Sequence, residues 1–182
     1  MLFNSLSFII FLIIFFIIYY VLKGKIRIYF CLIASYLFYS FFSFKFLFLI
    51  FLSTFIDYLA GIMINRNKGF KRKIYLFSSI FLNLLILGVF KYYNFFISSV
   101  VSFLSLLNFS VEIRTLNIIL PVGISFYTFQ SMSYSLDVYF KKCKVERNFL
   151  NFATFVGFFP QLIAGPIVRA KRFLPQLKIN QK

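Results

Sequence analysis

Long apolar runs separated by short basic segments divide the whole chain. A helix needs about 20 apolar residues to cross a hydrocarbon core of about 30 Å, so an uncharged run of this length predicts such a helix. The runs that meet or approach this length are residues 5–22, 28–44, 46–64, 74–90, 118–139 and 149–168. The pattern predicts an all-α integral membrane protein, a multi-span helical bundle in which residues 1–182 form a single unit.

Basic clusters between the runs predict the orientation of the helices. Lys23, Lys25 and Arg27 follow the first run, and further clusters lie within residues 65–73 and 141–147. Lys and Arg are enriched in the cytoplasmic loops of membrane proteins. We therefore expect these loops to face the cytoplasm and the N-terminus to lie outside.

The uncharged segment around residues 92–107 needs a different placement. If it also crossed, the next run at 118–139 would carry the basic residues of 141–147 to the outside, against the positive-inside rule. We therefore predict an interfacial or partial helix on the outer side for residues 92–107.

The last run, residues 149–168, contains residues that interrupt a helix. Proline lacks a backbone donor and glycine loosens the helix, and Pro160, Gly165 and Pro166 lie close together here. Basic residues flank the run on both sides, so a straight crossing would leave one cluster outside. A broken, re-entrant helix that turns back to the cytoplasmic side resolves this conflict, and a proline-kinked spanning helix is the alternative.

Polar residues inside the apolar runs are candidates for function. Asp57 lies within the run 46–64, where a carboxylate needs a partner, and Lys91 is the partner we expect. A structural ion pair or a side chain that reaches toward the membrane surface explains Asp57 equally well.

A second polar group follows the entry marked by Pro121 and Gly123. Gln130, Ser133 and Asp137 are spaced to share one helical face. Such a face must contact protein or water, and hydrogen bonds between helices account for it without any substrate.

Composition and charge narrow the function classes. Hydrophobic residues make up 62% of the chain, and no soluble domain of this size can cover so much apolar surface. The net charge of +16 arises mainly from the basic loops, which favours a topology-setting face over nucleic-acid binding, and we expect no nucleic-acid partner.

Histidine is absent, and the two cysteines are Cys31 in an apolar run and Cys143 in a basic loop. Zinc and haem sites of the usual kind are therefore excluded, as is any histidine-dependent mechanism within this chain. We expect no metal site, and we assign no catalytic residue.

Three sequence blocks resemble the membrane-bound O-acyltransferase family, in the order in which that family has them. They are LPVGISFYTFQSMSYSLDVY, ERNF, and FFPQLIAGPIVR followed by FLPQL. The bacterial branch that serves alginate O-acetylation and teichoic-acid D-alanylation is the most similar, and the resemblance covers essentially the whole chain. The matching residues are Gln130, Asp137, Glu146, Arg147, Asn148, Pro160, Gln161, Gly165, Pro166 and Arg169.

The resemblance implies acyl transfer across a bacterial inner membrane by a multi-pass enzyme. By this resemblance the donor would be acetyl-CoA or a related acyl donor, used as a substrate, with no bound cofactor. The acceptor would be a hydroxyl of an exopolysaccharide or cell-wall glycan, reached with a periplasmic acetyl-relay or transferase protein as a partner. The residues implied for the acyl path or substrate binding are Gln130, Ser133, Asp137, Gln161 and Arg169, and those that shape the backbone are Pro121, Gly123, Pro160, Gly165 and Pro166.

The chain departs from the family by lacking its histidine. Acyl transfer to a hydroxyl needs a base tuned near neutral pH, and histidine is the natural one. The resemblance thus implies the N-terminal half of such an enzyme, inactive alone and with the missing C-terminal half and the lipid bilayer as partners.

The sequence leaves two other classes of function open. A non-catalytic membrane scaffold would use the basic loops to bind anionic lipid or an acidic carrier protein. A transporter component would also combine broken helices with polar groups at the membrane midplane, although we find no internal repeat.

Overall fold

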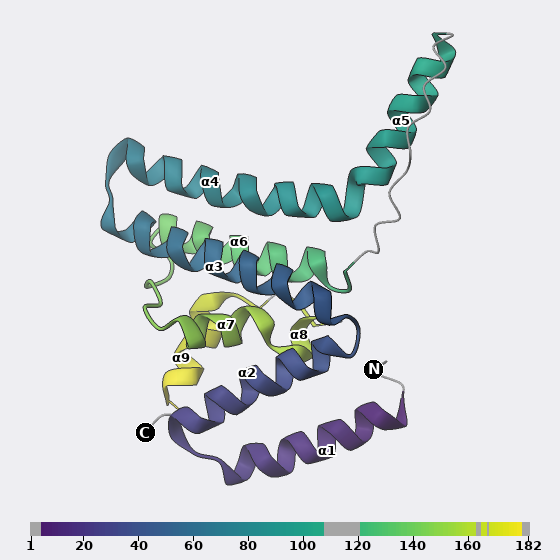
Figure 1. Ribbon diagram of the computed structural model, residues 1–182. Coiled ribbons are helices and arrows are strands. Elements are labelled where there is room, and N and C mark those ends of the chain that lie inside the picture. Colours follow the sequence, from purple (N-terminus) through teal and green to yellow (C-terminus); the bar gives the residue numbers. More distant parts are fainter. Residues whose placement is uncertain (1–4, 108–120, 163–164, 167, 180–182) are drawn as a thin grey trace.

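The computed structural model describes residues 5–107, 121–162, 165–166 and 168–179, and throughout these ranges the regular structure is helical, with no strand. The long helices lie roughly side by side, and short loops join the first four of them (Figure 1). They are α1 (Leu6–Val21), α2 (Gly24–Ser40), α3 (Phe44–Arg66), α4 (Gly69–Leu87) and α6 (Ile124–Tyr139). Helices α2 and α4 begin before the predicted runs at 28 and 74, because a helix continues through the basic residues that a hydropathy window excludes.

The bundle is layered. Helix α4 packs on α3 and α6, while α7 (Phe149–Gly157) and α8 (Phe159–Leu162) lie between that layer and the pair formed by α1 and α2 (Figure 1). The core lies where α3 and α6 meet α7, with Tyr134, Phe152 and Phe155 fully buried. A Cβ at Gly61 would lie 2.6 Å from the Tyr134 ring, so this glycine lets α6 approach α3 closely.

A π-helical turn, η1 (Gly88–Tyr92), separates α4 from α5 (Tyr93–Leu106), and α5 departs from the bundle at an angle (Figure 1). π-helical turns change the direction of a helix because they add a residue to one turn. None of the residues of α5 is buried. The segment predicted as an interfacial or partial helix is thus a helix that leaves the bundle, and its side of the membrane stays a prediction.

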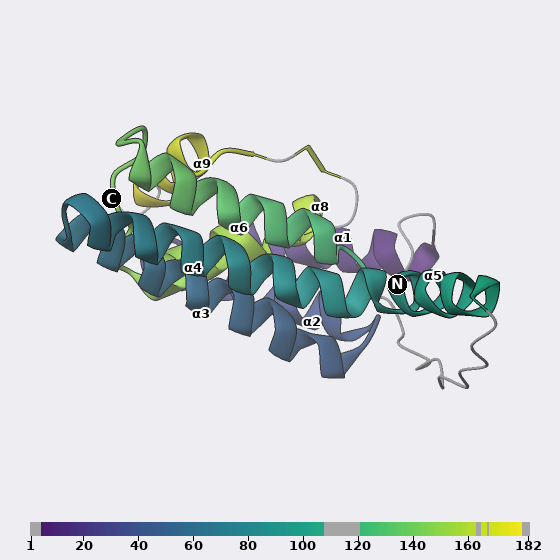
Figure 2. The same ribbon diagram turned by 90° about the horizontal axis from the view of Figure 1, so that it is seen from above.

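The run predicted at 149–168 is broken, as expected, but the break lies at Phe158 and not at Pro160. Phe158 is extended, with ψ 112°, and Pro160 lies inside the first turn of α8, where a missing N–H does no harm. After α8 the chain turns back to α9 (Ala170–Ile179), which lies near the C-terminal end of α6 (Figure 2).

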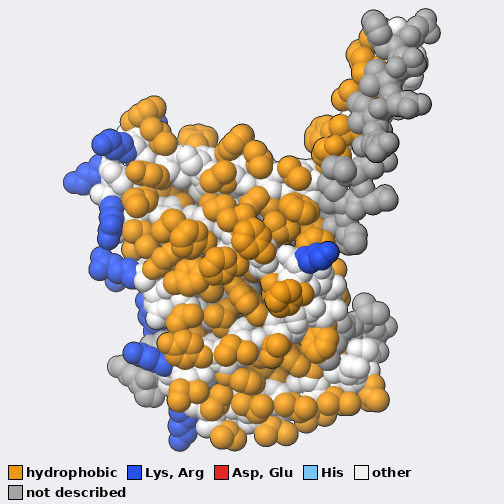
Figure 3. Space-filling model, viewed as in Figure 1, with side chains coloured by type: hydrophobic (Ala, Val, Ile, Leu, Met, Phe, Trp, Pro, Cys, Tyr) orange, Lys and Arg blue, Asp and Glu red, His pale blue; other side chains and the backbone are white. Residues whose placement is uncertain are grey.

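The outer surface is that of a membrane protein. Large apolar side chains cover the face shown in Figure 3, and most of the visible Lys and Arg side chains lie at one end of the helices. Among the described residues, two helical stretches are long and apolar enough to cross a membrane, Phe44–Arg66 and Gly69–Leu106, and Leu6–Val21 is a shorter apolar helix. The protein is an all-α integral membrane protein.

Candidate functional site

The broken segment meets α6 through a pair of glutamines. Gln130 is 3% exposed, and its Nε2 donates to the Phe155 carbonyl oxygen at 2.7 Å and to Gln161 Oε1 at 3.0 Å. The carbonyl lies near the end of α7, where helix carbonyls lose their partners within the helix. Two predicted residues far apart in the sequence are therefore in contact, and Gln130 joins α6 to both sides of the break.

A second contact forms where α6 begins. Gly123 has a left-handed φ of 75°, and a Cβ there would lie 2.3 Å from the Leu162 carbonyl oxygen. Both the backbone conformation and the space require glycine. Pro121 is buried and its carbonyl accepts from the Ile124 N–H at 3.2 Å, while Tyr39 Oη donates to the Val122 carbonyl at 2.9 Å.

The N–H exposed by the break is bound by a residue that the sequence did not single out. Ser35 Oγ accepts from the Phe159 N–H at 3.2 Å and donates to the Cys31 carbonyl at 2.6 Å. Ser35 is fully buried. Without it, the first N–H of α8 would be a buried donor with no partner, which is costly away from water.

The chain turns back after α8 at Gly165. A Cβ at this position would lie 2.7 Å from the Gln161 Cα and 3.0 Å from the Pro160 carbonyl oxygen. These neighbours are backbone atoms or are fixed to the backbone, so the close return needs glycine. Pro166 follows on the exposed side.

The return ends in an ion pair. Arg169 Nη1 lies 3.8 Å from Asp137 Oδ1, with the aspartate side chain 9% exposed and the arginine 58% exposed. The other carboxylate oxygen, Asp137 Oδ2, is buried and has no hydrogen-bond partner among the described residues. Arg169 thus lies beside the last turn of α6, at the same end as the loop that follows α6.

Ser133, the third residue of the predicted polar face, does not join these contacts. Its Oγ donates to the Gln130 carbonyl at 2.7 Å within α6. Of that face, the structure brings Gln130 and Asp137 into contact with other segments. The expected hydrogen bonding between helices is present at Gln130.

The second sequence block ties the loop after α6 to its neighbours. Asn148 Oδ1 accepts from the Leu150 N–H at 2.9 Å and so caps α7, and Glu146 Oε2 pairs with Lys178 of α9 at 2.9 Å. Arg147 contributes its carbonyl, which accepts from Tyr58 Oη at 2.6 Å, while the residue itself is exposed.

Asp57 is held by neutral donors. Ser79 and Ser135 donate to its Oδ1, and Ser131 and Asn83 donate to its Oδ2. The carboxylate is fully buried where α3, α4 and α6 meet. Its partners come from both neighbouring helices.

The predicted pairing of Asp57 with Lys91 is wrong. Lys91 lies in η1, beyond the end of α4, and its Nζ donates to Ser125 Oγ at 3.1 Å. Asp57 instead faces Ser79 and Asn83 of α4. Polar side chains of α4 and α6 satisfy the carboxylate without a cation.

The sequence did carry a signal for the residues missed around Asp57. Ser79 and Asn83 are four residues apart within one apolar run, as are Ser131 and Ser135 within another. Residues at this spacing share a helix face, and polar residues in a membrane helix turn toward protein.

A basic hollow lies where the loops after α3 and α6 meet. Its volume is about 670 Å³, and its basic lining residues are Lys68, Arg72, Lys141, Lys142 and Lys144. Arg72 donates to the Val138 carbonyl at 3.1 Å and to the Tyr139 carbonyl, at the C-terminal end of α6 where a cation is favourable. No carboxylate is among the described residues that line the hollow.

Cys143 also lines this hollow. Burial raises the pKa of its thiol, the carboxylates of Asp137 and Glu146 raise it further, and Lys178 lowers it. The thiol is therefore less reactive at neutral pH than that of an exposed cysteine. Within the described ranges, no three His, Cys, Asp or Glu side chains are grouped so that they could hold a metal ion.

Comparison with known proteins gives a consistent set of relatives. The chain is 38% identical over 181 residues to a probable alginate O-acetylase AlgI of Pseudomonas aeruginosa, covering 97% of this chain and 34% of that protein. It is 37% identical over 182 residues to AlgI of Azotobacter vinelandii, covering 97% and 36%. It is 33% identical over 176 residues to a peptidoglycan O-acetyltransferase of Helicobacter pylori, covering 80% and 32%.

The chain thus spans about a third of the length of these curated relatives. No protein-family model matches it. No solved structure matches it either.

Proposed function

Because the chain belongs to the membrane-bound O-acyltransferase family, we propose that it forms the N-terminal part of a multi-pass O-acyltransferase in a bacterial inner membrane. The whole enzyme would transfer an acetyl or other acyl group from a cytoplasmic donor to hydroxyls of an exopolysaccharide or cell-wall glycan. Relatives named for alginate and for peptidoglycan O-acetylation support this acceptor class.

The doubled-back segment is the observation that carries the proposal. Its tip lies against the start of α6, and it returns to the basic end at Arg169. Irregular backbone at membrane depth is tolerated where it lines a protein-enclosed passage. We assign the segment to the wall of such a passage, open at the basic end, where a negatively charged donor would enter.

Two side chains on this segment have proposed roles. Gln161 has an amide Nε2 for which no hydrogen bond is described, and this N–H group can orient a carbonyl oxygen of the acyl group. Arg169, exposed and held at one side by Asp137, can bind a phosphate of the donor. Both roles are those of binding and orienting groups.

The proton transfer must come from elsewhere. A hydroxyl acceptor needs a general base, and the chain offers no histidine. We propose that the base lies in the part of the relatives that this chain does not match, and that acetyl-CoA or a related donor acts as a substrate. A periplasmic relay or transferase protein would deliver the acyl group to the glycan.

Complementation tests this proposal. We expect the chain alone to add no acetyl groups to surface polysaccharide, and coexpression with the remaining two thirds of the Pseudomonas aeruginosa relative to restore acetylation, measured as glycan-bound acetate. In that pair, Gln161→Ala and Arg169→Gln should each lower acetylation at least about tenfold, since each removes an orienting or charge-assisted contact.

Arg66→Gln, an exposed arginine at the end of α3, is the matched control and should leave acetylation unchanged. Wild-type acetylation by the Gln161 and Arg169 variants would remove their assigned roles. Acetylation by the chain alone would refute the need for a second part.

The basic hollow favours a second candidate. A non-catalytic membrane scaffold could hold an acidic carrier protein against the five cations that line it. Failure to complement, together with salt-sensitive retention of an acidic acyl carrier protein by the purified chain, would favour this scaffold over the acyltransferase.

A further inference from the structure

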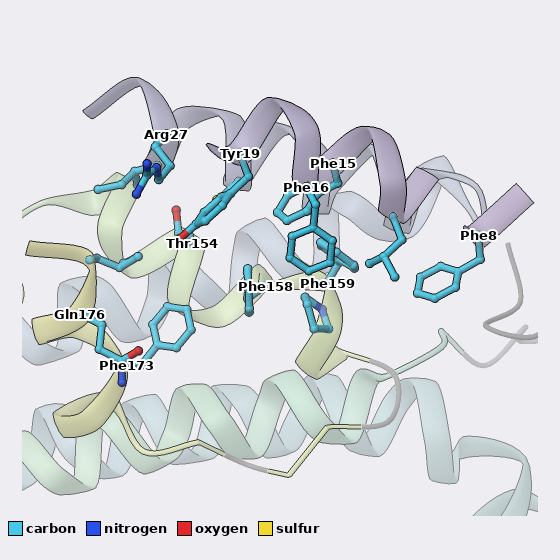
Figure 4. A pocket seen from close by; sticks show the side chains of 15 residues that line it. Phe8, Phe15, Phe16, Tyr19, Arg27, Thr154, Phe158, Phe159, Phe173 and Gln176 are labelled. Carbon is cyan, nitrogen blue, oxygen red and sulfur yellow. The ribbon is translucent and has the colours of Figure 1, made fainter. Parts of the chain in front are cut away.

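An apolar slot runs along α1 on the face that α7, α8 and α9 cover in part (Figure 4). Its volume is about 470 Å³. We call it the α1 slot, and its lining residues are Phe8, Leu12, Phe15, Phe16, Tyr19, Arg27, Ile28, Cys31, Thr154, Phe158, Phe159, Pro160, Phe173, Gln176 and Leu177. Most of the wall is aromatic or aliphatic.

The slot is about as long as one membrane leaflet is thick. Its α1 wall extends from Phe8 to Tyr19, which corresponds to roughly 16 Å at about 1.5 Å per residue. Half of a hydrocarbon core of about 30 Å is about 15 Å. The slot therefore has the length of a lipid acyl chain within a single leaflet.

The polar groups lie at one end of the slot. Figure 4 shows Arg27 and Gln176 at the end opposite to Phe8. Arg27 Nε donates to the Leu22 carbonyl at 2.8 Å, and its guanidinium lies 4.8 Å from the centre of the Tyr19 ring. These contacts fix the guanidinium, and among the described residues no carboxylate lies within ion-pair distance of it.

This end of the slot coincides with the basic end of the molecule. Lys23 lies in the connection between α1 and α2, and Lys25 and Arg27 lie in the first turn of α2. An apolar slot with cations at its mouth complements a molecule that has an apolar chain and an anionic head. The third polar lining residue, Thr154, uses its Oγ1 to donate to the Leu150 carbonyl at 2.8 Å.

We propose that the α1 slot binds one acyl chain of an anionic phospholipid, with its phosphate against Arg27. The cation at the mouth favours a lipid with an anionic head over a purely apolar helix. An extended peptide does not fit, because the wall offers too few polar groups for its backbone. This inference does not depend on the acyltransferase proposal.

Native mass spectrometry of the purified chain in detergent tests the slot. We expect the wild type to retain one dioleoyl phosphatidylglycerol, and Leu12→Trp, which fills the slot, to lose it at least about fivefold. Ile13→Trp is the control, because Ile13 is 55% exposed and lies outside the slot. If Leu12→Trp does not fold, Gln176→Trp at the exposed mouth replaces it. Equal retention by the slot-filling variant and Ile13→Trp would overturn the proposal.

The headgroup contact has its own test. The wild type should prefer phosphatidylglycerol over phosphatidylcholine of the same chains, and Arg27→Gln should reduce that preference about fivefold, the effect of one cation near a lipid surface. Lys25→Gln, an exposed lysine outside the slot, should change it less. An unchanged preference in Arg27→Gln, or displacement of the lipid by inorganic phosphate alone, would overturn the assignment to a lipid. Loss of the lipid when the remaining two thirds of a relative is coexpressed would assign the slot to protein and overturn it as well.

Discussion

Asp57 illustrates how single residues hold this bundle together. Four donors from α4 and α6 surround a carboxylate on α3, and a fifth group, Ser53, extends the network by donating to Asn83 Oδ1 at 2.7 Å. Between membrane helices a hydrogen bond contributes about 0.6 kcal/mol on average, and the largest reach about 1.7 kcal/mol. The four bonds to Asp57 therefore tie α3 to both α4 and α6.

Asp57→Ala should lower the free energy of unfolding by about 2–3 kcal/mol, because it leaves several buried donors without an acceptor. Unfolding in mixed micelles measures the change. Ser131→Ala removes a single donor and should cost about 1 kcal/mol or less. Equal stability of Asp57→Ala and the wild type would show that the network is not needed for stability.

Gly123 and Gly69 allow two reasons for a glycine to be compared, its backbone conformation and the space that its missing Cβ leaves. Both have a positive φ, 75° and 58°, but a Cβ at Gly123 would clash with the Leu162 carbonyl, whereas a Cβ at Gly69 meets nothing within 4 Å. Gly69→Ala should cost about 1 kcal/mol, from the backbone alone. Gly123→Ala should cost at least about 2 kcal/mol, because α8 must also move. The same unfolding assay compares the two variants. A similar loss of stability in both would mean that α8 can move aside without a cost in free energy.

Sequence reasoning found some of these residues and missed others for a clear reason. Gln130, Asp137 and Gly123 stand out as polar or flexible residues in apolar surroundings. Ser35 does not, because a serine in a membrane helix usually bonds to its own backbone, and the acceptor function of its Oγ depends on where Phe159 lies.

Among the elements, α7 and α8 are the most unusual, because a buried break separates them. The break at Phe158 leaves helix ends buried in protein, and side chains of α2 and α6 satisfy them through Ser35 and Gln130. The prolines, the glycine and the flanking basic residues predict a break but place it at Pro160. Pro160 is compatible with the first turn of α8, so the helix is interrupted at Phe158 instead.

Ser35→Ala should destabilise the protein by about 1–2 kcal/mol, because the Phe159 N–H then has no partner. Ser40→Ala removes a hydroxyl that bonds to the Leu37 carbonyl on an exposed part of the same helix, and its effect should stay within about 0.5 kcal/mol. Thermal unfolding in detergent would compare the two variants. An equal effect would show that α8 does not depend on α2 for its first N–H.

Over the whole molecule, the periodic alternation of apolar runs and basic loops predicted most of the helices. It could not predict how the helices pack, since their apolar faces are similar on all sides. Polar residues decide which helices meet, as Ser79 and Asn83 of α4 do by donating to Asp57 of α3. Nor could it show the bend at η1, because the residues of Gly88–Tyr92 are compatible with a regular helix.

Cys143 provides a test of the orientation of the whole molecule. It lies at the basic end, so a membrane-impermeant maleimide should label it in inside-out vesicles and not in intact spheroplasts. Because the pKa of its thiol is raised, labelling should be slow at pH 7 and faster as the pH rises, and slower than in the denatured chain at equal pH. Labelling in intact spheroplasts would reverse the proposed orientation, and equal rates for native and denatured chain would contradict the pKa shift.

The hydrogen bonds of Asp57 have a consequence for motion. Because one carboxylate joins α3 to both α4 and α6, none of these helices can open without breaking contacts of the other two. Their backbone amides should therefore exchange with deuterium as one cooperative block, while those of α5, which has no buried residue, exchange early and independently.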